Sequence, residues 1–150
     1  MKIKKKSFGV LSSGEKVSLF TVSNGEMSFS VTNYGCAITS IKVPSAKGKV
    51  DDVVLGYSTL DGYVKNGPFL GCLVGRFANR ISNAAFSIGG VTYKLTDNEG
   101  RNCLHGGKRG YHKMVWDAKP FSSTHEAGVV FTRTSFAGEQ GFPGNLDLQV

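Results

Sequence analysis

The stretch that decides the fold is Lys16–Thr32, which reads KVSLFTV-SNG-EMSFSVT. Two segments rich in β-branched and aromatic residues flank Ser23-Asn24-Gly25, and Asn-Gly between such segments is a strong signal for a tight hairpin turn. In the second segment, three apolar side chains alternate with serine and threonine, as they do in a half-buried antiparallel strand. The stretch therefore predicts a β-hairpin with strands over 16–22 and 26–32.

Further segments carry the same strand-like pattern, and turn residues separate them. Gly89-Gly90 lies between two alternating segments and predicts a second hairpin. The segment 51–56 has an apolar core typical of a strand buried on both faces, whereas 59–68 contains Asp-Gly and Asn-Gly-Pro and predicts a loop or a short helical turn. Besides the first hairpin, strands are expected at 37–43, 51–56, 85–88, 91–95, 115–121, 128–134 and 145–150.

The spacing of these segments predicts the fold class. No helical period is sustained, no internal repeat occurs, and turn signals recur about every 8–12 residues, which is typical of an all-β antiparallel β-sandwich. The last segment, 145–150, is still alternating where the chain ends at Val150. We therefore expect residues 1–150 to be the N-terminal part of a single, larger sandwich domain that is truncated here.

Composition and charge exclude several classes of partner. No run of about 18 apolar residues occurs, so no membrane-spanning segment is expected. The net charge is +7, but four of the positive charges are Lys2, Lys4, Lys5 and Lys6. We interpret this terminus as solvated and frayed, and expect no nucleic-acid partner. Because no apolar stretch follows these lysines, we also expect no signal peptide.

The cysteines favour a reducing compartment, and the cytoplasm is the expected location. Cys36, Cys72 and Cys103 are odd in number and lack CxxC spacing, so no zinc or other metal site is expected. Cys36 and Cys72 lie in apolar segments and are typical of small buried side chains. The Walker, Rossmann, GxSxG and HExxH motifs are all absent from the sequence.

Two polar motifs carry the candidate chemistry, Gly75–Ile81 (GRFANRI) and Asn102–Gly107 (NCLHGG). Arginine and asparagine supply hydrogen-bond donors for a polyhydroxyl ligand, and His105 can donate, accept or carry a proton near neutral pH. The structural alternatives stay open at this point, because an Arg-x-x-x-Arg pair is often a surface ion-pair element and a lone histidine is often a surface group. In an unbroken strand Asn79 and Arg80 would point to opposite faces.

Three other polar residues receive structural interpretations. His112, in a lysine-rich loop, and His125, after a run of serine and threonine, are both expected to be solvated. The stretch Gly138–Asn145 is typical of a tight turn in which proline fixes φ and glycine supplies positive φ. Glu139 is the only carboxylate there, and nothing in the sequence pairs it with His105.

Five stretches form an ordered set along the chain. They are Asn33–Ser40 (NYGCAITS), Asp52–Tyr57 (DVVLGY), Gly75–Ile81 (GRFANRI), Leu104–Gly107 (LHGG) and Gly141–Asn145 (GFPGN). In this order the chain resembles the aldose 1-epimerase (galactose mutarotase) family from end to end. The resemblance implies a large antiparallel β-sandwich, a supersandwich, with a sugar cleft on one sheet. It also implies that Asn79, Arg80 and His105 contact the sugar, whereas Arg76 matches a position that we regard as structural.

The resemblance further implies a cofactor-independent interconversion of the α and β anomers of hexoses such as galactose and glucose. The family's general acid is a second histidine in a His-x-Tyr-Phe-Asn-Leu-like motif, and its general base is a late glutamate. Neither motif is present, and His112, His125 and Glu139 do not match them. A catalytically inactive sugar-binding or regulatory module on the same fold is the alternative. A third hypothesis is an enzyme for phosphorylated hexoses, because the positive net charge of the chain could suit a phosphate. The motifs argue against it, since they resemble those of a family that acts on uncharged sugars.

Overall fold

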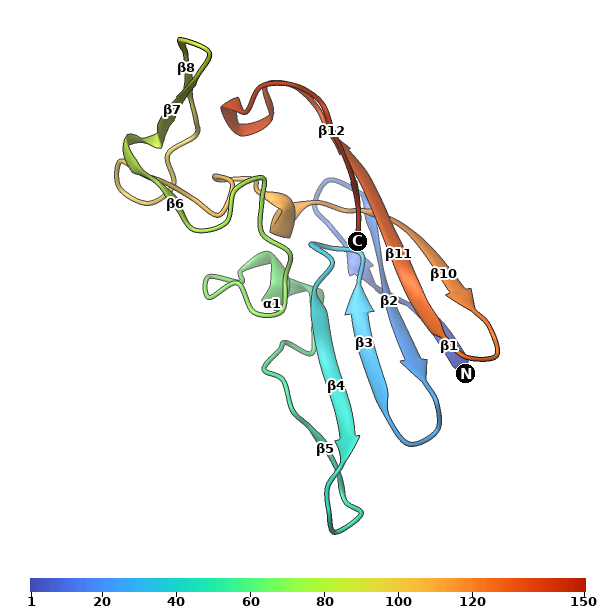
Figure 1. Cartoon of the computed structure of the whole chain (residues 1–150). Coiled ribbons are helices and arrows are strands. Elements are labelled where there is room, and N and C mark those ends of the chain that lie inside the picture. Colours follow the sequence, from blue (N-terminus) through green and yellow to red (C-terminus); the bar gives the residue numbers. More distant parts are fainter.

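The computed structural model describes residues 1–150, and two antiparallel sheets form its main body, beside two small two-stranded sheets (Figure 1). The larger sheet has five strands in chain order, and the smaller one has three. The strands are β1 (Lys2–Val10), β2 (Lys16–Ser23), β3 (Ser28–Thr32), β4 (Ile38–Pro44) and β5 (Val50–Asp52), then β10 (Asp117–Ser122), β11 (Ala127–Ser135) and β12 (Leu146–Gln149). The fold is thus mostly strands, and the predicted all-β antiparallel class is confirmed.

The predicted first hairpin is present as β2 and β3, with Leu19 opposite Thr32 and Val22 opposite Phe29. Its turn is longer than expected because the Asn24 side chain organises it. Asn24 Oδ1 accepts hydrogen bonds from the backbone N–H groups of Glu26 (3.0 Å) and Met27 (2.8 Å). Strand β3 therefore begins at Ser28 rather than at residue 26.

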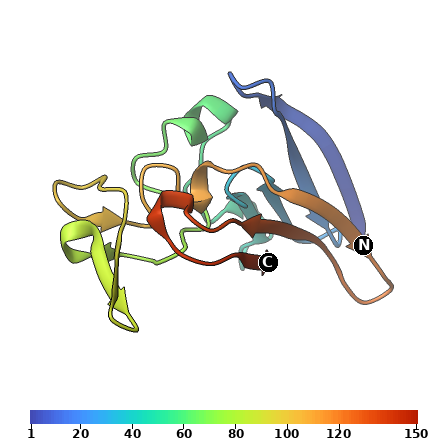
Figure 2. The ribbon, with the colours of Figure 1, turned by 90° about the horizontal axis from the view of Figure 1, so that it is seen from above.

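The core lies between the two sheets, which Figure 2 shows as separate layers with β1 and β2 on one side and β10 to β12 on the other. Phe20 of β2 and Phe131 of β11 meet edge to face, with ring centroids 6.3 Å apart. Trp116, only 1% exposed, packs beside them, and its indole N–H donates to the Tyr111 carbonyl oxygen at 3.3 Å. These aromatic contacts hold the sheets together as a sandwich.

Two expectations about local structure are wrong. The basic N-terminus is not frayed, because Lys2 to Val10 pair along β2 as an ordered edge strand while their ammonium groups stay solvated. The segment 51–56 is not buried on both faces. Its strand β5 has three residues and pairs only with β4, so that Val53 and Leu55 remain 59% and 78% exposed.

The middle of the chain folds into short elements beside the sandwich, and it contains the candidate motifs. The helical turn expected within 59–68 is present as α1, which has five residues, and no helix of the structure has the length and apolarity to cross a membrane. The predicted second hairpin projects from the sandwich as β7 and β8 (Figure 1). The elements are α1 (Leu60–Val64), β6 (Arg80–Ile81), β7 (Ala85–Ile88), β8 (Val91–Lys94), β9 (Cys103–Leu104) and 3-10 turns at Ser82–Ala84, Tyr111–Lys113 and Glu139–Gly141.

Candidate functional site

The two polar motifs lie side by side, because the short strands β6 and β9 pair antiparallel with Arg80 opposite Leu104. Just before β6 and just after β9, two hydrogen bonds join the motifs. The backbone N–H of His105 donates to the Asn79 carbonyl oxygen at 2.9 Å, and the backbone N–H of Asn79 donates to His105 Nδ1 at 2.9 Å. The structure therefore brings together all three residues singled out from the sequence.

The hydrogen bond to His105 Nδ1 fixes how the ring can act. Because Nδ1 accepts a hydrogen bond from the backbone N–H of Asn79, the neutral imidazole carries its own hydrogen on Nε2. The ring therefore offers an N–H donor to a ligand. Asn79 and His105 both have left-handed backbone conformations, with φ of 67° and 50°. The chain thus bends at Asn79 instead of continuing as a strand, and the Asn79 Oδ1 atom accepts from Arg80 Nη1 at 3.1 Å.

Glu99 is a member of this group that the sequence reasoning missed. Arg80 Nε donates to Glu99 Oε2 at 2.6 Å, and Arg80 Nη2 donates to the other carboxylate oxygen, so the pair is bidentate. The hydrogen bonds from Arg80 hold the pKa of Glu99 below its usual range, and Glu99 in turn raises the pKa of Arg80. Glu99 lies 19 residues after Arg80 in the sequence, and a single carboxylate at that distance forms no recognisable sequence motif. Only the pairing of β6 with β9 places it.

Glycines allow the histidine loop to lie directly on the arginine motif. A Cβ atom on Gly106 would stand 1.5 Å from the carbonyl oxygen of Gly75, and the φ of Gly106 is +87°. A Cβ atom on Gly110 would stand 2.5 Å from the carbonyl oxygen of His105. The loop that carries His105 therefore packs backbone against backbone, which only glycine permits.

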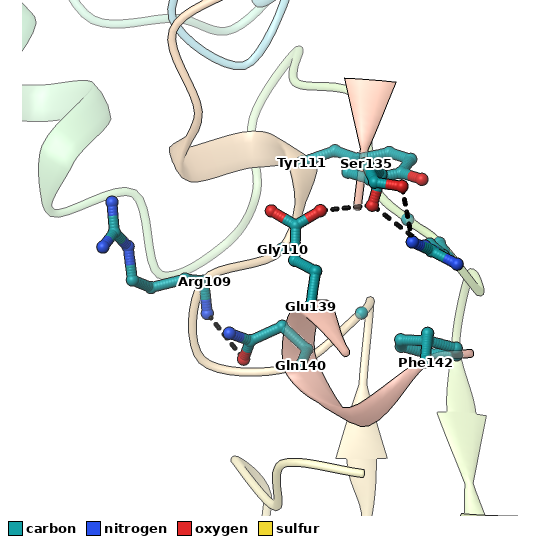
Figure 3. A pocket seen from close by; sticks show the side chains of 10 residues that line it. Arg109, Gly110, Tyr111, Ser135, Glu139, Gln140 and Phe142 are labelled. Carbon is teal, nitrogen blue, oxygen red and sulfur yellow. Dashed lines mark hydrogen bonds between the residues drawn. The ribbon is translucent and has the colours of Figure 1, made fainter. Parts of the chain in front are cut away.

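Arg76 lies behind this site and ties it to the sandwich. Its guanidinium donates to the Ser135 hydroxyl at 2.9 Å and to the backbone carbonyl oxygens of Ser135 (2.7 Å), Phe136 (2.9 Å) and Pro143 (2.8 Å). The narrow gap around these groups, drawn in Figure 3, has no room for a water molecule. These contacts agree with the structural role expected for Arg76.

Glu139 belongs to the same supporting layer. In Figure 3 its carboxylate points toward Ser135, whose hydroxyl donates to it, and the Arg133 guanidinium makes a bidentate ion pair with it. Burial alone would raise the pKa of Glu139, but the hydrogen bonds from Arg133 and Ser135 outweigh burial and lower the pKa. Glu139 sits in a 3-10 turn, as the turn expected at 138–145 implies, and its oxygens are engaged away from His105.

His112 is not the solvated loop residue that we expected. It is 6% exposed, because the 3-10 turn Tyr111–Lys113 directs its ring inward against Phe69. The Phe69 ring lies between two histidines, with ring centroids 4.8 Å from His105 and 4.7 Å from His112. The Nδ1 atom of His112 is enclosed without a hydrogen-bond partner. His125, by contrast, is exposed in the loop between β10 and β11, as expected.

The burial of His112 predicts a loss of stability toward acid. Burial, the Lys113 charge and the His105 ring lower the pKa of His112 to about 4. Between about pH 4 and about pH 6.5 the unfolded chain binds a proton at this residue that the folded chain does not bind. The free energy of unfolding is therefore largest at neutral pH and decreases as the pH falls. We expect the free energy of unfolding to drop by about 2 kcal/mol from this residue between about pH 7 and 5.

Urea unfolding at several pH values measures this slope. The variant His112→Phe should flatten it, whereas His125→Phe, at an exposed position, should keep the wild-type slope. The carboxylates with lowered pKa values, Asp52, Glu99 and Glu139, lose their contribution below about pH 4.5 and so lie outside this window. An unchanged slope in His112→Phe would contradict the prediction.

The cysteines form no disulfide and belong to no metal-binding group in the structure. No group of three His, Cys, Asp or Glu residues is arranged to hold a metal ion. The three cysteines are free, and burial raises the pKa of the Cys36 thiol to about 12 and that of Cys72 to about 11. These thiols therefore stay protonated near neutral pH and are poor nucleophiles.

The sequence is similar to curated proteins over most of its length. A family model described as Aldose 1-epimerase matches residues 18–150. The galactose mutarotase of Mus musculus is 41% identical over 144 residues, which cover 95% of this chain and 41% of that protein. The aldose 1-epimerase of Escherichia coli (strain K12) is 34% identical over 138 residues, covering 91% of this chain and 39% of that protein. The chain thus spans about two fifths of the length of the curated relatives it matches.

Two solved structures share the fold. The galactose 1-epimerase from Lactobacillus acidophilus NCFM superposes with a TM-score of 0.84 at 28% sequence identity, covering 99% of this chain and 43% of that one. An aldose epimerase homologue from C. elegans superposes with a TM-score of 0.78 at 29% identity, covering 87% of this chain and 39% of that one. The first of these superpositions extends over nearly the whole chain, including the short elements that carry Asn79, Arg80 and His105.

Proposed function

The chain belongs to the aldose 1-epimerase family, and from this premise we propose that it supplies the sugar-contacting part of a site that interconverts the α and β anomers of a hexose. Galactose and glucose are the proposed substrates. The activity is proposed for the whole protein that carries this chain, since the matched relatives are about two and a half times as long.

The observation that carries the proposal is the group of fixed donors made by Asn79, Arg80 and His105. The backbone N–H of Asn79 donates to His105 Nδ1, so the neutral ring carries its hydrogen on Nε2 and can donate it to a ligand. Glu99 holds the Arg80 guanidinium in place with two hydrogen bonds and leaves part of its fork of N–H groups for a ligand. A sugar, with several hydroxyl oxygens and a ring oxygen, suits such a group of donors.

In the proposed reaction a base removes the proton of the anomeric hydroxyl on C1 while an acid delivers a proton to the ring oxygen. The bond between C1 and the ring oxygen breaks, which gives the open-chain aldehyde. Rotation about the C1–C2 bond presents the other face of the aldehyde, and the reverse proton transfers close the ring as the other anomer. We place His105 Nε2 and the Arg80 guanidinium beside the ring oxygen, where they stabilise the charge that develops on it.

We assign neither proton transfer to a residue of this chain. The motifs of the family's second histidine and late glutamate do not occur in the sequence. Glu99, the carboxylate in contact with Arg80, has both oxygens engaged by that residue and is not a free base. Positioned acids and bases each contribute about 10²–10⁴-fold to a rate. We therefore propose that residues 1–150 alone have little or no mutarotase activity.

Because Arg80 binds both oxygens of Glu99, this carboxylate is not available as a base. This supports a second candidate function, a sugar-binding or regulatory module without turnover. The two candidates differ in the complete protein that carries this chain. Polarimetry on fresh α-galactose or α-glucose detects mutarotation directly. Turnover in the complete protein supports the enzyme, and galactose binding without turnover supports the module. Turnover by residues 1–150 at the rate of a full-length relative would contradict the proposal that they hold only part of the site.

Binding by the chain itself is tested with His105→Ala. We expect galactose affinity, measured by calorimetry, to fall about tenfold, because one hydrogen bond in a site is worth roughly a factor of ten. His125→Ala is the matched control, since this histidine is exposed in a remote loop, and its affinity should equal that of the unmodified chain. Equal galactose affinity in the two variants would remove His105 from the proposed site.

A further inference from the structure

A hollow of about 410 Å³ adjoins the proposed sugar contacts. Its walls come from the end of α1 and the loop after it, from the loop that precedes β9, and from the loop that follows His105. Its volume falls within the range of small-molecule pockets, about 300–1,000 Å³. None of the five motifs that identified the family includes the lysines that line it, which are Lys65, Lys108 and Lys113.

The charge of this hollow is of one sign. Three lysines line it, and none of its lining residues is an aspartate or a glutamate. Lys65 and Lys113 take part in no ion pair. Lys108 lies 3.2 Å from Asp97, but both side chains are more than 60% exposed, so solvent weakens that pair. Lysines that line a concave surface with no carboxylate in its lining attract an anion.

The wall between the lysines contains a buried polar side chain with unused hydrogen-bonding capacity. His112 lines the hollow and is 6% exposed, and neither of its ring nitrogens makes a hydrogen bond within the chain. Nδ1 is fully enclosed, so Nε2 is the nitrogen left open to a ligand. The neutral His112 ring can carry its hydrogen on Nε2 and donate it to a ligand in the hollow.

The loops that form the walls are already fixed by their own hydrogen bonds. The Asn66 side chain donates to the Leu70 carbonyl oxygen at 3.0 Å and accepts from the Leu70 N–H at 2.9 Å. The Asn98 side chain bonds the backbone of Leu104 in the same two-fold way, at 2.9 Å and 2.7 Å. The hollow is therefore preformed, which lowers the entropic penalty of binding.

The hollow lies next to the proposed sugar contacts, with Phe69 as the shared wall. This ring lines the hollow and lies between His105 and His112, at 4.8 Å and 4.7 Å. Gly107, two residues after His105, also lines it. A sugar ring held at His105 can therefore extend one of its substituents past Phe69 toward the lysines.

We propose that this hollow is a subsite for an anionic substituent, a phosphate or a carboxylate, on a sugar held by Asn79, Arg80 and His105. Lys65 and Lys113 bind the anion, and His112 Nε2 donates to it from the wall. The inference rests on the proposed sugar-binding function and extends it to a class of substrate. The basis is the local arrangement of these side chains and not the net charge of the chain, which the N-terminal lysines dominate.

The test compares four ligands by calorimetry at low salt, namely galactose, galactose 6-phosphate, galacturonate and inorganic phosphate. We expect galactose 6-phosphate to bind about tenfold more tightly than galactose, as a charge-assisted hydrogen bond allows, and this ratio should shrink as salt is added. In the double variant Lys65→Ala/Lys113→Ala the ratio should fall to about one. The control double variant Lys47→Ala/Lys119→Ala removes two exposed lysines from elsewhere and should keep the tenfold ratio.

The outcomes separate this inference from the proposed function. Tightening by galactose 6-phosphate alone assigns the subsite to phosphate, and tightening by galacturonate as well assigns it to anionic substituents in general. Equal affinity for galactose and galactose 6-phosphate, or an unchanged ratio in Lys65→Ala/Lys113→Ala, overturns the subsite and leaves sugar binding intact. If inorganic phosphate binds in a lysine-dependent way while no sugar binds, the anion site stands and the proposed function fails. Absence of binding by all four ligands overturns both.

Discussion

Replacing Gly106 with alanine should destabilise the chain by about 3 kcal/mol or more. The added Cβ would stand 1.5 Å from the Gly75 carbonyl oxygen, and that oxygen belongs to the backbone and cannot rotate away. The φ of +87° adds the strain of a left-handed conformation. The clash should also push the loop carrying His105 away from Asn79 and abolish galactose binding. Urea unfolding and calorimetry measure the two effects.

Gly14→Ala is the matched control for this prediction. Gly14 has the same φ of +87°, but a Cβ atom there would meet nothing within 4 Å. This variant carries the backbone strain without the clash, and it should lose only about 1–2 kcal/mol and keep its affinity for galactose. If Gly106→Ala is no less stable than Gly14→Ala, the close approach of the two loops is not what makes glycine necessary at 106.

Replacing Arg80 with alanine should weaken galactose binding about 50-fold, the largest loss expected from any one contact residue. The guanidinium makes charge-assisted hydrogen bonds, which are worth more than neutral ones. Its removal also leaves the Glu99 carboxylate unpaired beside His105, where it would bind the histidine or repel sugar oxygens. The measurement is a calorimetric galactose titration of the variant and of the unmodified chain.

Two further variants make the Arg80 result specific. Arg101 is an exposed arginine in the same loop as Glu99, and it makes no ion pair. The variant Arg101→Ala should therefore leave galactose affinity unchanged. Arg80→Ala/Glu99→Gln removes the unpaired charge and should recover part of the affinity that Arg80→Ala loses. If Arg101→Ala is as harmful as Arg80→Ala, the general positive charge of this surface, and not the Arg80–Glu99 pair, governs binding.

The first hairpin and the two polar motifs illustrate how far sequence reasoning reaches. Apolar and polar residues alternate in Lys16–Thr32, which indicates strands with one buried face whatever covers that face. The pattern therefore predicts β2 and β3 without knowledge of the partner sheet. The two wrong expectations about strands share one cause. The pairing of β1 with β2 and the exposure of Leu55 depend on which strands lie at the edge of the sheet, and no local pattern encodes that position.

The candidate site divides in the same way. The sequence by itself determined the all-β class and the residues that carry the family motifs, Asn79, Arg80 and His105, because alternation, turn glycines and motif order are local properties of the chain. Only the tertiary structure decided that Glu99 forms a bidentate ion pair with Arg80 and that His112 is buried against Phe69. Both contacts join loops that are distant in sequence, and burial is a property of the packing around a side chain and not of its immediate neighbours.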